Sequence, residues 1–81
     1  MADTSQTLDT LPLNQKARIV EYTDDIVSQH LLEMGCLPGY EVYVNNIAPL
    51  GDPISIVVTG TIISLRKNDA ACVLVSTDNL L

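Results

Sequence analysis

The sequence predicts a mainly β fold, a small five-stranded β-barrel that carries one α-helix. Short runs in which apolar and polar residues alternate recur along the chain, with Gly, Pro and Asn residues between them. Only one stretch, near residues 25–34, has helical periodicity. The chain has 81 residues, which is enough for one small domain. Many short strands joined by tight turns in so short a chain favour a barrel.

The first strand and the helix are predicted next to each other. Residues 15–22 form the strand, in which Ala17 and Ile19 occupy alternate positions. Asp24 and Asp25 then predict the start of a helix that runs to about residue 34, because acidic side chains satisfy free amide groups and favour the positive end of the helix dipole. At about 100° per residue, the arc expected to face the core contains Ile26, Val27, His30, Leu31 and Met34.

Two further strands follow from alternation. Val42 and Val44 alternate with more polar residues, and the pattern changes phase at residues 45–46, which predicts a bulge or a bend. Residues 67–69 are expected to form a polar turn. Residues 71–76 are expected to form the closing strand, whose inward side chains are Val73 and Val75.

The clearest local signal is a hairpin over residues 54–65. A two-residue turn at Thr59-Gly60 lies between two apolar runs. The expected register places an apolar face on one side of the hairpin and a mixed face on the other. The apolar pairs are Val58 with Thr61, Ile56 with Ile63, and Ile54 with Leu65, and the outward pairs are Val57 with Ile62 and Ser55 with Ser64.

Charge and composition exclude several classes of partner. Ten acidic residues oppose four basic ones, so the formal net charge is −6. That charge repels phosphate backbones and anionic headgroups, so neither nucleic acid nor a membrane surface is an expected partner. No apolar run approaches the roughly 20 residues that span a bilayer, and the N-terminus lacks the features of a signal peptide. We therefore expect a cytoplasmic protein.

The ends of the chain and the cysteines follow from the same reasoning. Residues 1–10 are rich in Asp, Thr and Ser, which predicts a disordered N-terminal tail. The folded domain is expected to span residues 11–76, and residues 77–81 form a C-terminal tail. In the cytoplasm, Cys36 and Cys72 are expected to be reduced thiols.

The sequence offers little for catalysis or for a metal centre. His30 is the only histidine, and the chain has neither a glycine-rich phosphate loop nor a recognisable nucleophile motif, so we do not expect an enzyme. A ferrous site commonly uses two histidines and a carboxylate, and a zinc site uses closely spaced cysteines. We expect His30 to be a packed or edge side chain with a hydrogen-bond partner. As a metal ligand it is a weak candidate, able only to bind a divalent ion together with a nearby carboxylate, and no cofactor is expected.

Several apolar residues are candidates for contact with a partner. Leu50 lies in a loop stiffened by Pro49 and Pro53, where Asp52 can bond its own backbone, and a leucine there gains little burial in its own domain. Val57, Ile62 and Leu74 point outward from their strands, which predicts either cover by the helix or tail or a sticky face for self-association or docking. Leu32 falls among polar helix positions. It either packs on a wider arc or lines a cleft between helix and barrel.

Two sequence blocks carry a family resemblance. The first is Leu-Leu-Glu-Met-Gly-Cys-Leu-Pro-Gly at residues 31–39, and the second is Ala-Pro-Leu-Gly-Asp-Pro-Ile at residues 48–54, with Ser-Leu-Arg-Lys at residues 64–67. Together they resemble the FeoA family of bacterial ferrous iron transport from about residue 11 to about residue 76. The resemblance implies an SH3-like barrel with the helix inserted after the first strand. Asn14 replaces a glycine common in the family, and asparagine tolerates the left-handed backbone that such a position requires.

The resemblance also implies a function. A FeoA-like protein is expected to support the membrane transporter FeoB, which carries a cytoplasmic GTPase domain, by protein–protein contact. We expect that contact at a loop–helix cleft, with Leu32, Leu37 and Leu50 as candidate residues. An alternative is a metal-responsive sensing domain, because such barrels also resemble the C-terminal domains of iron-dependent repressors. A third expectation is homo-oligomerisation through Val57, Ile62 and Leu74.

Overall fold

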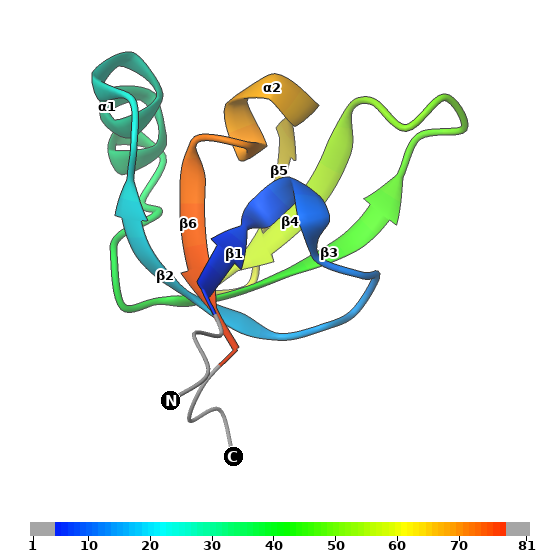
Figure 1. The fold of residues 1–81 in the computed structure, drawn as a ribbon, viewed down its shortest axis with the longest axis horizontal. Helices are drawn as coiled ribbons and strands as arrows, with labels where there is room; N and C mark the ends of the chain where they lie inside the picture. The colour runs from blue at the N-terminus through cyan, green and yellow to red at the C-terminus, as the bar shows by residue number, and fades with distance from the viewer. Residues whose placement is uncertain (1–4, 78–81) are drawn as a thin grey trace.

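The computed structural model describes residues 5–77. The strands found there form one antiparallel six-stranded sheet in the order β1-β6-β2-β3-β4-β5. Figure 1 shows this sheet curling around a single core, with α1 at one end of the long axis and the β3–β4 connection at the other. The elements are β1 (Ser5–Thr7), the 3-10 helix η1 (Leu8–Thr10), β2 (Ala17–Tyr22), α1 (Asp25–Glu33), β3 (Glu41–Ile47), β4 (Ile54–Val58), β5 (Thr61–Leu65), α2 (Lys67–Ala70) and β6 (Val73–Ser76). The mainly β, barrel-like architecture is confirmed, with six strands in place of five.

The core is built from alternate strand positions. Along β4, Ile54, Ile56 and Val58 are buried, while the residues between them are only half-buried. The same alternation buries Val73 and Val75 of β6, as predicted. The other buried side chains are Leu8, Leu11, Ala17, Ile19, Leu31, Cys36, Val42, Val44, Ile63, Leu65 and Ala70.

The hairpin and the bulge are confirmed residue by residue. β4 and β5 pair with all five of the predicted partners, from Ile54 with Leu65 to Val58 with Thr61. Thr59 and Gly60 have φ angles of 50° and 81°, as a tight two-residue hairpin turn requires. The register of β3 against β4 shifts between Val44 and Asn46, where the sequence pattern changes phase.

The N-terminal prediction is wrong for residues 5–10. β1 pairs with β6, with Ser5 opposite Ser76 and Thr7 opposite Leu74. Leu8 follows in η1 and is only 1% exposed, so this segment fills the core. Pairing with a strand far along the chain and burial of one leucine order a segment whose own composition is polar. The rest of the predicted tails, residues 1–4 and 78–81, lies outside the described residues, and the polar turn expected at residues 67–69 is the first part of α2.

Helix α1 begins as predicted but presents a narrower apolar face. Asp24 is the N-cap, and its Oδ1 accepts hydrogen bonds from the backbone N–H groups of Ile26 at 2.9 Å and Val27 at 3.0 Å. Leu31 is buried and Val27 packs against the core, yet Ile26 is 80% exposed and His30 is exposed. The prediction that His30 faces the core is therefore wrong. The helix packs mainly against β2, so only the strip around Leu31 is covered.

Candidate functional site

Leu50 is the most exposed large apolar side chain in the described part of the chain, with 96% of its surface accessible. It lies in a turn closed by the hydrogen bond that Gly51 N donates to Ala48 O over 2.7 Å. Pro49 takes the turn position for which proline presets φ, and Gly51 has a φ of 89°. The turn therefore holds Leu50 away from the barrel.

Two further hydrogen bonds anchor this connection. Ala48 N donates to Pro53 O over 3.1 Å, which closes the base of the loop. Asp52 does not bond its own backbone; its Oδ1 accepts from the N–H of Lys67, the first residue of α2, at 2.9 Å. The loop is thus attached at both its base and its side. No local sequence signal identifies this contact, because the two residues are 15 positions apart.

The predicted loop–helix cleft does not form. The connection that carries Leu50 and helix α1, which carries Leu32, lie at opposite ends of the long axis (Figure 1). Leu32 is 41% exposed on α1, and Leu37, which follows the helix, is 39% exposed. These two leucines can contribute to a surface at the helix end, but not to one pocket shared with Leu50.

The outward strand residues form a row that differs from the predicted face. Val57 lies opposite Ile62 of β5 on one side and opposite Tyr43 of β3 on the other. Ile62 is 66% exposed, and Val57 and Tyr43 are half-buried. Leu74 lies on β6, which two strands, β2 and β3, separate from β4 in the sheet order, and its neighbours across the strands are Thr7 and Glu21. The prediction of one face with Leu74 in it is wrong, and Tyr43, whose outward position follows from the alternation in β3, takes its place.

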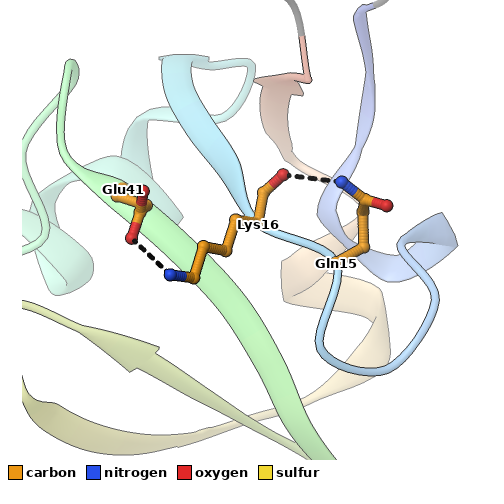
Figure 2. A network of polar contacts seen from close by, with 3 residues as sticks. All are labelled: Gln15, Lys16 and Glu41. Atoms are coloured by element: carbon orange, nitrogen blue, oxygen red, sulfur yellow. Dashed lines mark hydrogen bonds and ion pairs between the residues drawn. The ribbon is translucent and has the colours of Figure 1, made fainter. Parts of the chain in front are cut away.

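A shallow depression lies beside this row. It has a volume of about 410 Å³ and is lined by Gly39, Tyr40, Glu41, Tyr43, Val57, Thr59 and Gly60. Figure 2 shows the polar contacts near Glu41, whose carboxylate lies 4.0 Å from the ammonium group of Lys16. Gln15 Nε2 in turn donates to the backbone oxygen of Lys16 over 3.0 Å. The two charged side chains are 63% and 49% exposed, so this ion pair contributes little to stability.

The titratable groups within residues 5–77 do not gather into a metal site. Among residues 5–77, no group of three or more His, Cys, Asp or Glu side chains is placed to hold a metal ion. His30 stands exposed on α1. Cys36 is buried, and burial raises the pKa of its thiol, which disfavours the reactive thiolate. In the described part of the chain both Cys36 and Cys72 are free.

Tyr22, the last residue of β2, is hydrogen-bonded to the segment that follows α1. Its ring packs against the core, and its hydroxyl donates a hydrogen bond to the backbone oxygen of Cys36. Burial, and to a smaller extent the neighbouring Cys36, raise the pKa of Tyr22 to about 12. The phenol is therefore a structural donor that stays protonated near neutral pH.

No helix among the described residues is long and apolar enough to cross a membrane.

Comparisons with known proteins agree with this fold. A family model described as the FeoA domain matches residues 6–77. The solved structure of a FeoA-like protein from Clostridium acetobutylicum matches with a TM-score of 0.83 and 30% identity, over 94% of this chain and 88% of that one. FeoA from Stenotrophomonas maltophilia, solved in complex with zinc, matches with a TM-score of 0.78 and 32% identity, over 88% and 89% of the two chains.

A second group of matches shares the fold at lower identity. The T. acidophilum IdeR structure has a TM-score of 0.79 and 21% identity. The match covers 96% of this chain and 36% of that one. At that identity the likeness shows the fold alone.

Proposed function

The chain belongs to the FeoA family of ferrous iron transport, and on that premise we propose that it is a non-enzymatic cytoplasmic accessory protein that binds the cytoplasmic portion of FeoB. FeoA is not a known enzyme family. The chain has the size of an interaction domain, and its exposed apolar groups suit contact with another protein. The proposed mechanism is binding that supports iron uptake.

The exposed Leu50 carries this proposal. A leucine that is 96% exposed adds nothing to the stability of its own domain. The turn that presents it is held by hydrogen bonds at Ala48, Gly51 and Asp52. A preformed loop loses less conformational entropy on binding than a loose one does, so such a side chain is well suited to enter an apolar pocket on a partner. We place the FeoB contact at this tip.

The experiment is an uptake assay in cells that lack this protein. The cells receive the wild type, Leu50→Glu, or the matched control Ile26→Glu, and each variant is tested for Fe(II) uptake and for co-purification with FeoB. Ile26 is 80% exposed and belongs to α1, the helix at the opposite end of the long axis from the loop, so the control introduces the same charge at an exposed position away from the loop. Leu32→Glu, at the helix end, is a third variant. Circular dichroism verifies that each variant folds.

We expect Leu50→Glu to lose both co-purification and uptake, while Ile26→Glu retains them. Full activity of Leu50→Glu would contradict the placement of the contact. Loss with Leu32→Glu and not with Leu50→Glu would move it to the helix end. Absence of FeoB from every preparation, with or without nucleotide, would remove the proposal.

A metal-sensing domain is the alternative function. It requires several convergent ligands, and within residues 5–77 the exposed His30 has no group of His, Cys, Asp or Glu around it that could share an ion.

A further inference from the structure

Among the strands of residues 5–77, β5 ends the sheet, and one of its edges has no partner strand. The strand order stops at β5, so in the described part of the chain only β4 pairs with it. Natural edge strands are usually kept short, or carry charges, prolines or bulges that prevent pairing with another chain. The opposite edge, β1, follows this rule with three residues. β5 has five residues, Thr-Ile-Ile-Ser-Leu, with no charge and no proline.

The backbone groups on the open edge can be assigned from the hairpin. In a hairpin closed by two residues, the residues that flank the turn exchange hydrogen bonds, and bonded pairs then alternate along the ladder. The flanking pair here is Val58 with Thr61, so Thr61, Ile63 and Leu65 direct their backbone groups toward β4. Ile62 and Ser64 therefore direct theirs toward the open edge.

The side chains of the outer face reach the same edge. Tyr43, Val57 and Ile62 lie opposite one another on three neighbouring strands, and exposure is greatest at the last of them, where Ile62 is 66% exposed. An apolar row that ends in an exposed isoleucine beside unpaired backbone groups is complementary to an added strand. The occupant must therefore be a β-strand with its own apolar outer residue.

We propose that this occupant is the β5 strand of a second copy of the chain, paired antiparallel across a two-fold axis at Ile63. In this register Ile62 lies opposite Ser64 of the other copy, and Ser64 lies opposite Ile62. Every outward N–H and C=O group of these two residues then has a partner, which gives four hydrogen bonds across the axis. An axis at Ile62 would leave the groups of Ser64 facing the Thr59-Gly60 turn of the other copy, which cannot continue the ladder.

The charge of the chain and the small area of one strand pair both indicate that the dimer has a low affinity. The chain has a net charge of −6, which opposes self-association over most of its surface, but β5 itself is uncharged and Arg66 and Lys67 follow it. One strand pair buries less than the roughly 1,200–2,000 Å² of a stable interface, so the dimer is weak and depends on concentration. The β5 edge is a different surface from the Leu50 loop, so the dimer does not depend on the FeoB contact.

Sedimentation equilibrium of the full chain across a wide concentration range tests the proposal. We expect a monomer–dimer equilibrium in the wild type and a dissociation constant at least about tenfold higher in Ile62→Lys, which places like charges near each other on the diagonal. Ser64→Pro removes one outward N–H without removing a bond to β4, and we expect it to weaken the dimer as well. Ile26→Lys, an equal change at an exposed site on α1, should leave the equilibrium unchanged.

Cysteine cross-linking tests the register. Ile62→Cys and Ser64→Cys proteins should form a covalent dimer under mild oxidation when they are mixed, because directly opposite residues lie within disulfide reach. Each variant alone should cross-link more slowly than the mixture, because its two introduced thiols lie on the diagonal. The native Cys36 and Cys72 are common to all samples and set the background. A strictly monomeric wild type at high concentration, a dimer indifferent to Ile62→Lys, or rapid cross-linking of Ile62→Cys alone would each overturn the proposal.

Discussion

Removing the Tyr22 hydroxyl tests how α1 is held to the barrel. Tyr22→Phe keeps the ring that packs against the core and deletes the donor to the backbone oxygen of Cys36. A neutral hydrogen bond contributes about 0.5–1.5 kcal/mol, so we expect the free energy of unfolding to fall by about 1 kcal/mol. Urea unfolding should show a lower midpoint with an unchanged slope, because the surface exposed on unfolding is the same.

The pH dependence of stability provides a second, independent readout. Burial raises the pKa of Tyr22 to about 12, against about 10 in the unfolded chain. The folded state therefore holds this proton more tightly, and the resulting stabilisation is fully present below pH 10 and is lost as the pH rises to about 12. Two pKa units correspond to at most about 2.7 kcal/mol. Because the ring is only half-buried, we expect about 1 kcal/mol.

The assay compares the wild type with Tyr22→Phe by urea unfolding at pH 9 and pH 12, together with tyrosinate absorbance. Between these two pH values, the free energy of unfolding should fall by about 1 kcal/mol more in the wild type than in the variant. The difference between the two absorbance titrations isolates Tyr22 and should have its midpoint near pH 12. Equal stability losses, or a difference titration centred near pH 10, would refute the claim that this phenol is held as a buried donor.

Three other substitutions test separate parts of the fold. Thr59→Asn should raise the free energy of unfolding by about 1 kcal/mol, because Thr59 has a φ of 50°, which asparagine tolerates better. This gain includes the loss of the 2.7 Å hydrogen bond that the Thr59 hydroxyl donates to Val58 O. A lower melting temperature of the variant would contradict this. Asp52→Ala should lower the free energy of unfolding by about 1 kcal/mol and accelerate hydrogen exchange at the Lys67 amide, because that amide loses its acceptor. Unchanged exchange at Lys67 would contradict the contact. Leu31→Ala should lower the free energy of unfolding in urea by about 2–5 kcal/mol, because Leu31 is the buried residue of α1. A decrease below about 1 kcal/mol would show that Leu31 does not hold α1 against the barrel.

The sequence predicts the hairpin in full because its signals are local. Thr59-Gly60 sets the turn, and a two-residue loop leaves one register for the flanking apolar residues. The N-cap at Asp24 is local in the same way, because it depends on one side chain and the two amide groups that follow it. The left-handed backbone at Asn14, with a φ of 65°, agrees with what the family resemblance implies for that position.

The failures share a different cause. β1 forms because residues 5–7 pair with β6, which lies nearly seventy positions later in the chain. Three polar residues carry no hydrophobic periodicity from which such a distant pairing could be predicted. A helical projection that assumes a broad buried face puts His30 on the core side, whereas α1 packs mainly against β2 and buries only Leu31. Leu74 points outward as its pattern indicates, but only the strand order separates it from Val57.

The most direct test of the proposed function is the affinity of this chain for the cytoplasmic portion of FeoB, measured by calorimetry for the wild type, Leu50→Ala and Ile26→Ala. Burial of one leucine side chain contributes about 1.5–3 kcal/mol, so Leu50→Ala should raise Kd by about 10- to 100-fold. Ile26→Ala should leave Kd within about twofold of the wild type. Equal affinity of Leu50→Ala and the wild type would contradict the account, and so would the absence of any binding heat with or without nucleotide.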